Sequence, residues 1–510
     1  MLSIIKSFGL CGLSGYLVKC EVDINYGMPG YEVVGLVGTS TKESKERVRG
    51  AIKNMGLQYP TTKIIINLAP ADIKKDGPVY DLAIAVGILS ASGQVKYDHV
   101  PDYVFLGELG LDGSLRNVNG VLPIIISARQ LGYTKFIIPN DNAKEASFID
   151  GIEVRSAGNL KQVANFLNGD EDIPIVPHTD FEEIQNSHPY KYDFKYVKGQ
   201  AMAKRALEIS AAGGHNVIMI GPPGSGKTML AKCFPSILPK LTFEEALEVT
   251  KIHSIAGKLN PKEGIITTRP FRAPHHTATL LALTGGGRLA VPGEISLAHT
   301  GVLFLDEMPE YKRDAIETLR QPLEDGKISI ARIERSVEYP AIFTLIASMN
   351  PCPCGNYGNP EKECKCTPSA IHKYLNKLSG PIMDRIDMHI EVASVTYNEL
   401  TSDDLEEDSA SIKLRVDKAR HIQLERFKGT DVYCNAKMTD TMLKKYCKIS
   451  EQANEFLEFA FDRLNLSARA YNRILKVART IADLDGSENI LDEHLTEAIS
   501  YRMMDKKYWD

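Results

Sequence analysis

Residues 221–228 of this chain read Gly221-Pro222-Pro223-Gly224-Ser225-Gly226-Lys227-Thr228. The pattern is that of a phosphate-binding loop, in which glycines let backbone N–H groups converge on phosphate oxygens. An apolar run, 216–220, precedes the loop, and a helix-like run, 229–234, follows it. This context predicts a strand, a loop and a helix whose N-terminus attracts an anion. We therefore expect a nucleoside triphosphate here, with Lys227 on its phosphates and the Thr228 hydroxyl available to Mg²⁺.

A second motif further along the chain supplies two adjacent carboxylates. Its sequence is Gly301-Val302-Leu303-Phe304-Leu305-Asp306-Glu307, an apolar run that ends in acidic residues. A buried strand would deliver both carboxylates to its C-terminal end, where open α/β sheets bind ligands. Asp306 would then hold the Mg²⁺ shell, and Glu307 would polarise the attacking water. The alternative is an ordinary strand with an acidic end, and the phosphate loop argues against it.

Three further polar residues are candidates for the ATP site. Asn350 follows a strand-like run, 341–348, and its amide can orient the lytic water. Arg385 is a candidate arginine finger for the ATP of a neighbouring subunit, although a surface ion pair with an adjacent aspartate is the alternative. Arg469 begins a helix-like run, where it can either reach the γ-phosphate or belong to a solvated helix face.

Four of the nine cysteines lie close together in the sequence, on a Gly- and Pro-rich loop at 352–366. Two Cys-x-Cys pairs on such a loop can bring four thiolates to one tetrahedral Zn²⁺, with the ligands Cys352, Cys354, Cys364 and Cys366. A closed four-thiolate site is structural because it leaves no open coordination position. Disulfides or free thiols are the alternatives, and His372 is a possible substitute ligand.

The bulk composition excludes some classes of protein. The 510 residues are 43% hydrophobic and 25% charged, with a formal net charge of −5. A chain of this length needs more than one hydrophobic core. Because the net charge is slightly acidic, a nucleic acid would have to bind a local patch or a pore. No apolar run approaches a membrane span, and residues 1–25 are unlike a signal peptide, so we expect a cytoplasmic protein.

Changes of pattern divide the chain into four regions. Residues 1–170 alternate short apolar strands with amphipathic helices. Residues 171–194 are rich in Asp, Glu, Pro and His, as linkers are. Residues 195–395 alternate strands and helices around the phosphate loop, which predicts a parallel sheet, and 396–510 are helix-like. The predicted fold class is therefore α/β.

The combined motifs resemble the AAA+ ATPases. Within them, the chain is similar to the magnesium-chelatase-like branch at residues 269–276, 292–299 and 319–324. The resemblance covers essentially the whole chain and is strongest to the YifB/ComM family, whose best-described member is a hexameric branch-migration helicase of bacterial natural transformation. It implies an AAA+ module at 195–395, a C-terminal helical lid, ATP and Mg²⁺ as ligands, DNA (single-stranded or branched) as partner, and a homo-hexamer.

Two segments of this resemblance bear on DNA. Residues 325–332 have the turn and alternation of a β-hairpin, which projects into the pore in related ring helicases. Lys327 and Arg332 would then contact phosphates. A second candidate pore insert includes Gly285-Gly286-Gly287-Arg288. From the sequence alone, solvent-facing hairpins with scattered charges are the alternative.

The N-terminal region resembles the Lon-protease catalytic domain at 72–82 and 106–113. In that family a nucleophilic serine follows the Gly-Pro pair, but this chain has Val79 there. The partner lysine would fall near Leu122. Because neither side chain can act in a Ser–Lys dyad, we expect a protease-dead domain, as also occurs in the bacterial repair ATPase RadA.

The sequence leaves three functional hypotheses. The leading one is a hexameric ATP-driven DNA motor that promotes branch migration. The second is an AAA+ remodeller of protein targets, as in the magnesium-chelatase motor subunit. The third is a non-catalytic ATP-binding scaffold, which the presence of both Asp306 and Glu307 disfavours.

Overall fold

The computed structural model describes residues 2–185, 190–287, 290–330, 336–358, 362–395, 406–464 and 467–503. Two compact units account for the chain. Unit 1 comprises Met1–Ser187 and Thr242–Thr267, and unit 2 comprises His188–Leu241 and Thr268–Asp510. The segment Thr242–Thr267 therefore folds with the N-terminal residues, although it lies within the range 195–395 in sequence.

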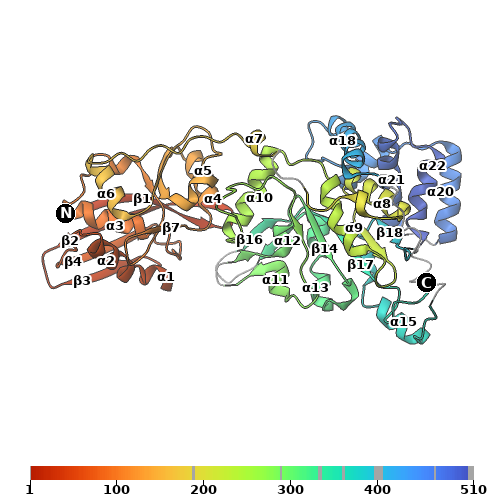
Figure 1. The fold of residues 1–510 in the computed structure, drawn as a ribbon, viewed down its shortest axis with the longest axis horizontal. Coiled ribbons are helices and arrows are strands. Elements are labelled where there is room, and N and C mark those ends of the chain that lie inside the picture. Colours follow the sequence, from red (N-terminus) through yellow and green to blue (C-terminus); the bar gives the residue numbers. More distant parts are fainter. Residues whose placement is uncertain are drawn as a thin grey trace. The chain divides into compact units, whose positions relative to one another are not determined.

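Unit 1 is built on a mixed sheet, which has seven strands in the described residues, in the order β3-β4-β2-β1-β5-β8-β9 (Figure 1). The pairs β1–β2 and β2–β4 are antiparallel, and the remaining neighbours are parallel. A small ribbon, β6–β7, accompanies it. The strand bounds are β1 (Leu2–Cys11), β2 (Ser14–Asn25), β3 (Gly30–Val34), β4 (Lys63–Ala69), β5 (Val104–Phe105), β6 (Glu108–Leu109), β7 (Leu115–Arg116), β8 (Lys135–Pro139) and β9 (Glu153–Ala157).

The helices of unit 1 cover this sheet. Every residue of α3 is buried, because this helix packs on β1, β2, α2 and α6. Helix α10, from the inserted segment, packs on α4. The helices are α1 (Thr39–Lys42), α2 (Ser44–Asn54), α3 (Asp81–Ala91), α4 (Val121–Gln130), α5 (Ala143–Ala146), α6 (Leu160–Asn168), α7 (Phe181–Gln185) and α10 (Phe243–Ile255), with 3-10 turns η1 (Val100–Asp102) and η2 (Asn140–Asn142).

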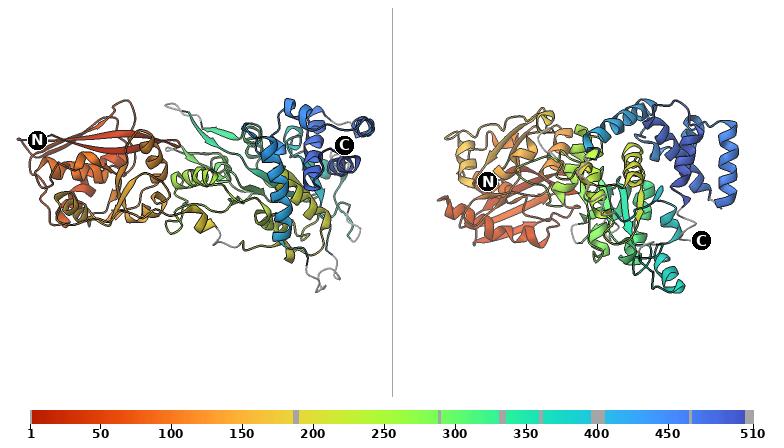
Figure 2. Two further views of the ribbon diagram at one scale, coloured as in Figure 1. Left: turned by 90° about the horizontal axis from the view of Figure 1, so that it is seen from above. Right: turned by 45° about the vertical axis from the view of Figure 1, so that its right-hand side comes forward.

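Unit 2 is coloured from yellow through green to blue in Figure 2. It contains a wholly parallel sheet with the order β11-β14-β17-β10-β18. All residues of β10 and β14 are buried, which explains their uninterrupted apolar sequences. Two antiparallel ribbons, β12–β13 and β15–β16, lie outside this sheet. The bounds are β10 (Val217–Ile220), β11 (Phe271–Arg272), β12 (Gly285–Gly286), β13 (Val291–Pro292), β14 (Val302–Leu305), β15 (Lys327–Ile330), β16 (Val337–Pro340), β17 (Thr344–Met349) and β18 (Met388–Glu391).

The helices of unit 2 share one hydrophobic core with the sheet. Helices α18 and α21 pack on α8, and their apolar side chains join those of β10 and β18. The helices are α8 (Ala201–Gly213), α9 (Lys227–Cys233), α11 (Leu280–Thr284), α12 (Glu294–Leu297), α13 (Arg313–Glu317), α14 (Arg320–Asp325), α15 (Pro368–Leu375), α16 (Gly380–Met383), α18 (Ser409–Arg426), α19 (Asp440–Tyr446), α20 (Glu451–Leu464), α21 (Ala468–Leu484) and α22 (Asp492–Ser500). The 3-10 turns are η3 (Phe194–Tyr196), η4 (Phe234–Ile237), η5 (Met308–Glu310) and η6 (Asn435–Lys437).

The mixed α/β class predicted from the sequence is confirmed by this architecture, with a parallel sheet around the phosphate loop. Among the described helices, none has the length and apolar character needed to span a membrane.

Candidate functional site

Three neighbouring strands of unit 2 carry the predicted nucleotide-site residues at one edge of the sheet. Strands β14, β17 and β10 are adjacent and parallel, with Ile220 opposite Met349 and Leu305 opposite Ala347. The segments that follow them therefore emerge side by side. They are residues 221–228, the pair Asp306 and Glu307, and Asn350. This edge is where open parallel sheets bind ligands.

The phosphate loop needs glycine for its backbone conformation. Gly224 and Gly226 have φ angles of 78° and 90°, in the left-handed region. A Cβ on either residue would meet no atom within 4 Å, so the requirement is conformational rather than steric. Gly226 is the N-cap of α9, and the loop therefore leads directly into a helix N-terminus.

Lys227 is buried, with 8% of its surface exposed, and its ammonium points back into the loop. Its Nζ atom donates to the carbonyl oxygens of Gly221 and Pro222, each at 2.8 Å, and lies 3.5 Å from Asn350 Oδ1. Burial lowers the pKa of Lys227 to about 8, although Asp306 and Glu307 act in the opposite direction. An anion bound in the loop would replace the carbonyls as the partner of this cation.

The Asp306 carboxylate is held between two hydroxyl groups. Thr228 Oγ1 donates to Asp306 Oδ2 at 2.9 Å, and Ser348 Oγ donates to Asp306 Oδ1. Ser348 Oγ also accepts the backbone N–H of Glu307 at 3.1 Å. The pairing of Thr228 with Asp306 brings together the two oxygens expected around Mg²⁺, so these residues fit that ion. Ser348 was not a sequence candidate, because a serine inside an apolar strand gives no functional signal.

Glu307 projects from a strained backbone position. Its φ angle is 51°, and its side chain is 52% exposed. The Nδ1 atom of His276 lies 3.9 Å from Glu307 Oε2. The His276 ring packs against His275 and the edge of Tyr311. Both histidines lie in 269–276, one of the segments similar to the magnesium-chelatase-like branch, and the sequence alone predicted no role for either of them in the site.

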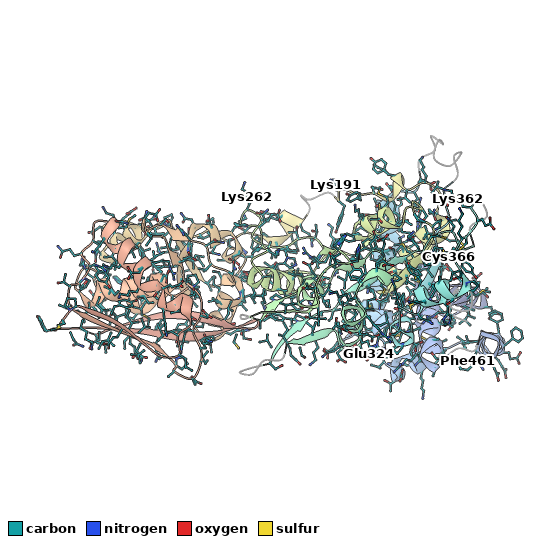
Figure 3. The ribbon with its side chains drawn as sticks, turned by 90° about the horizontal axis from the view of Figure 1, so that it is seen from below. Lys191, Lys262, Glu324, Lys362, Cys366 and Phe461 are labelled. Carbon is teal, nitrogen blue, oxygen red and sulfur yellow. The ribbon has the colours of Figure 1, made fainter. Side chains whose placement is uncertain are left out.

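Arg385 and Arg469 do not join the hydrogen-bonded cluster formed by Lys227, Thr228 and Asp306 in the described residues. Arg385 is 8% exposed, donates to the Pro381 carbonyl at 2.6 Å and forms an ion pair with Glu324 (labelled in Figure 3). The ion-pair partner of Arg385 is therefore Glu324 and not one of the nearby aspartates that the sequence suggested. Arg469 lies exposed in the first turn of α21, which Ser467 caps.

A ribbon is present near the hairpin expected at 325–332, but only β15 lies in that range, and its partner strand β16 lies at Val337–Pro340. Gly326, with a φ of 66°, ends α14, and β15 follows immediately. Lys327 Nζ lies 3.0 Å from Glu338 Oε2 on the opposite strand, and about half of each side chain is exposed. Arg332 and Arg288 lie outside the described residues.

The four predicted cysteine ligands come together in space. Their Sγ atoms all lie within 4.8 Å of one another, and three of the separations are 3.4, 3.7 and 3.7 Å. Zn–S bonds of about 2.3 Å in a tetrahedron would separate the sulfurs by about 3.8 Å. The separations are too long for disulfide bonds, and all four cysteines are free. The group therefore fits a tetrahedral metal, and His372 instead hydrogen-bonds to Asn376.

Backbone N–H groups surround the cysteine sulfurs. The N–H groups of Asn356 and Lys365 lower the pKa of Cys354 to about 6. The Tyr357 N–H donates to Cys352 Sγ at 3.3 Å. Backbone N–H groups act in the same direction on Cys364 and Cys366, but burial and the neighbouring thiols raise the pKa of both above the usual value. Metal binding requires the thiolate form, so a bound cation would have to offset this effect.

In unit 1, the positions of the Lon-type dyad carry apolar side chains in one cluster. Leu122 is buried, and Val79 packs against the cluster that contains it. The Leu122 backbone N–H donates to Glu145 Oε2 at 3.3 Å. Neither side chain can supply a nucleophile or a base at these positions.

Comparisons with known proteins agree with this geometry. Family models described as "Magnesium chelatase, subunit ChlI", "Subunit ChlI of Mg-chelatase" and "Magnesium chelatase, subunit ChlI C-terminal" match residues 193–400, 20–142 and 406–502. The competence protein ComM of Haemophilus influenzae is 44% identical over 506 residues, which cover 99% of this chain and 98% of that protein. The chain belongs to the YifB/ComM family. Escherichia coli YifB is 43% identical over 507 residues, or 99% of this chain and 98% of YifB.

This member of the YifB/ComM family also matches two further proteins over shorter segments. Lon protease 2 of Bacillus subtilis is 35% identical over 140 residues, which are 27% of this chain and 24% of the protease. The DNA repair protein RadA of Streptococcus pyogenes is 38% identical over 93 residues, which are 18% of this chain and 20% of RadA. The family resemblance inferred from the motifs is thereby confirmed, and the likeness to Lon is partial.

Proposed function

We propose that this member of the YifB/ComM family is an ATP-driven hexameric motor that translocates on DNA and promotes branch migration in recombination. The observation that carries the proposal is the cluster of Lys227, Thr228, Asp306, Glu307 and Asn350 at one sheet edge. Magnesium-chelatase-like AAA+ proteins are ATPases as a class. The name of the Haemophilus relative supports a role in competence, and that of RadA supports a role in DNA repair.

The residues of the cluster divide the chemistry of hydrolysis among them. On ATP binding, Lys227 exchanges the Gly221 and Pro222 carbonyls for the β- and γ-phosphates. Thr228 and Asp306 would hold Mg²⁺, which neutralises charge on the phosphates. Glu307 accepts a proton from water as the water oxygen attacks the γ-phosphorus and the bond to the β–γ bridging oxygen breaks.

Three polar side chains complete the proposed site. Asn350 orients the attacking water from the end of β17. Arg385 acts on the ATP of the neighbouring subunit, where it offsets the charge that develops in the transition state. Arg469 contacts the γ-phosphate from the helical lid at 396–510.

DNA would lie along the β15–β16 hairpin, with Lys327 on its phosphates and Arg332 as a second contact. A charge pair between Lys327 and Glu338 must open before Lys327 can bind a phosphate.

We further propose that Cys352, Cys354, Cys364 and Cys366 bind a structural Zn²⁺, that unit 1 has no peptidase activity, and that the protein is cytoplasmic.

Steady-state ATP hydrolysis tests the motor proposal. The purified full-length protein is assayed alone, with single-stranded DNA and with a four-way junction, and Glu307→Gln serves as the blank. We expect strong stimulation by DNA, followed by unwinding of forked or four-way substrates. A flat response from a folded hexamer would contradict a DNA motor.

A second candidate function is the remodelling of protein targets. The match of three family models to a magnesium-chelatase subunit favours it. This alternative predicts an ATPase that is insensitive to DNA and is stimulated by a protein partner. The same assay therefore separates the two functions.

A further inference from the structure

In unit 2, Gly355 of the cysteine loop lies against Pro223 of the phosphate loop. Gly355, between Cys354 and Asn356, is buried against Pro223. A Cβ on Gly355 would lie 2.4 Å from Pro223 Cδ and 2.8 Å from Pro223 Cγ. Gly355 also has a φ of 79°. A glycine is therefore needed here both for the backbone conformation and for the close approach to the proline ring.

A second connection runs through Asn350. This residue ends β17 and precedes Cys352 by two positions, and its Oδ1 atom lies 3.5 Å from Lys227 Nζ. The Tyr374 hydroxyl, on α15, forms a hydrogen bond with the Asn350 backbone. Tyr374 is itself buried. Helix α15 therefore supports the residue that meets the phosphate-loop lysine.

Helix α15 begins directly after the last of the four cysteines. Thr367 caps it by accepting the backbone N–H of Ala370 at 3.3 Å, and Cys366 is the preceding residue (labelled in Figure 3). The cysteine loop is thus attached to the nucleotide site at both ends: Asn350 lies just before Cys352, and the helix bearing Tyr374 follows Cys366.

The described part of the cysteine loop has little apolar support of its own. Cys352 is fully buried, but Cys354, Tyr357 and Gly358 are exposed, as are the described residues 362, 363 and 365. A loop without a core keeps one conformation when a metal ion joins its ligands, because metal binding supplies the missing folding energy. The position of Gly355 would therefore depend on the metal.

We propose that metal bound by the four cysteines sets the nucleotide affinity of the phosphate loop, through the contact of Gly355 with Pro223 and through Asn350. The inference rests on the proposed ATP and Zn²⁺ sites and adds that the second controls the first. With the metal bound, the cysteine loop supports Pro223 and Asn350 in the conformation that receives phosphates. Without it, both lose that support and nucleotide binding weakens.

A matched pair of glycine variants isolates the contact. Gly355 and Gly358 lie in the same loop with similar φ angles, 79° and 74°, but a Cβ on Gly358 would meet no atom within 4 Å. Full-length Gly355→Ala and Gly358→Ala are compared for zinc content by metal analysis and for affinity toward a fluorescent ATP analogue with Mg²⁺. We expect both to keep zinc, and Gly355→Ala to bind the analogue about tenfold more weakly than Gly358→Ala. Equal affinities would overturn the inference.

A second substitution tests whether the proline ring is the partner. Pro223→Ala removes the Cγ and Cδ atoms that a Cβ at position 355 would strike. Because the proposed contact supports Pro223, Pro223→Ala should itself weaken binding of the analogue, and adding Gly355→Ala to it should cause little further loss. A purely additive loss in the double variant would show that the two positions act independently and would contradict the proposed contact.

Removal of zinc tests whether the metal controls nucleotide binding by the phosphate loop. Zinc is withdrawn by a chelator or by Cys366→Ser, and the affinity for the analogue is measured alongside far-ultraviolet circular dichroism. We expect at least a tenfold loss of affinity with little loss of helix signal. Unchanged affinity after zinc loss, or a native protein without zinc, overturns this inference while the ATPase proposal stands. A zinc-loaded protein that binds no nucleotide would instead overturn the proposed function.

Discussion

Arg385 and Glu324 form an ion pair within a single subunit. The Arg385 side chain is 10% exposed and that of Glu324 is 49% exposed, so the arginine is enclosed while its partner faces solvent. A finger that acts on the ATP of a neighbouring subunit has to leave this carboxylate for a phosphate. The pair therefore competes with the proposed catalytic contact.

Mixed hexamers test whether Arg385 acts across a subunit interface. Arg385→Ala and Lys227→Ala subunits should each be inactive alone, because one lacks the finger and the other lacks the phosphate-binding lysine. When they are mixed, some interfaces combine an intact Lys227 with an intact Arg385 from the next subunit. We expect ATPase activity to reappear, with a maximum at intermediate ratios. Assembled mixtures that stay inactive at every ratio would argue against a shared site.

Glu324→Gln tests the competition itself. Half-exposed ion pairs contribute about 0.5–1 kcal/mol, so release of Arg385 should raise DNA-stimulated kcat about two- to fivefold. Steady-state kinetics of the variant hexamer measure this. If Glu324→Gln lowers kcat as Arg385→Ala does, the carboxylate positions the finger and does not withhold it.

Loss of the general base should separate binding from hydrolysis. Glu307→Gln preserves the size of the side chain but removes the carboxylate, so kcat should fall by about 10²–10⁴-fold while ATP affinity is kept. Rapid-mix hydrolysis and equilibrium binding of a fluorescent analogue measure the two quantities. Retained turnover would assign the base to another residue.

His276 should also influence ATP hydrolysis, but more weakly than Glu307 does. Its Nδ1 atom lies 3.9 Å from Glu307 Oε2, so His276→Ala leaves the carboxylate less restrained and should lower kcat about five- to tenfold with an unchanged KM. His275→Ala is the matched control, because His275 packs on His276 and hydrogen-bonds to Thr277 at 2.8 Å. Equal effects of the two variants would indicate a general loss of packing.

The buried lysine predicts a pH dependence of ATP binding. Because its pKa falls from 10.5 to about 8, the charged form of Lys227 costs stability below pH 8, and this cost is relieved as the pH rises toward 10.5. Phosphates favour the ammonium, so ATP binding should take up a larger fraction of a proton at pH 8.5 than at pH 7. Calorimetry in two buffers of different ionisation heat measures the uptake. Equal uptake at the two pH values would contradict the lowered pKa.

The hairpin predicts opposite effects of two neighbouring charges on DNA binding. Glu338→Gln frees Lys327 from its partner and should tighten binding a few-fold, whereas Lys327→Ala should weaken it and reduce the salt dependence by about one phosphate contact. Binding to single-stranded DNA across a salt series measures both. If neither variant changes the slope or the affinity, the described part of the hairpin makes no contact with DNA.

The sequence predicted those parts of the site that depend on local pattern. An apolar strand followed by a glycine-rich turn, or by two acidic residues, fixes the ends of β10 and β14 because neighbouring residues determine them. Contacts between residues that are far apart in the sequence leave no local pattern from which they could be predicted. The pairing of Arg385 with Glu324, the support of Asp306 by Ser348 and the approach of Gly355 to Pro223 depend on tertiary packing alone. The return of Thr242–Thr267 to unit 1 was missed for the same reason.

Because Thr242–Thr267 folds with unit 1, fragments of the protein have to be designed with care. The chain passes between the two units at Leu241–Thr242 and at Thr267–Thr268, in addition to the boundary after Ser187. A fragment ending near residue 187 would lack α10, whose Ser254 hydroxyl donates to the buried Glu145 at 2.9 Å. The complementary fragment would carry α10 without the side chains that bury it. Functional dissection therefore calls for point variants in the intact chain, since a truncation damages both halves at once.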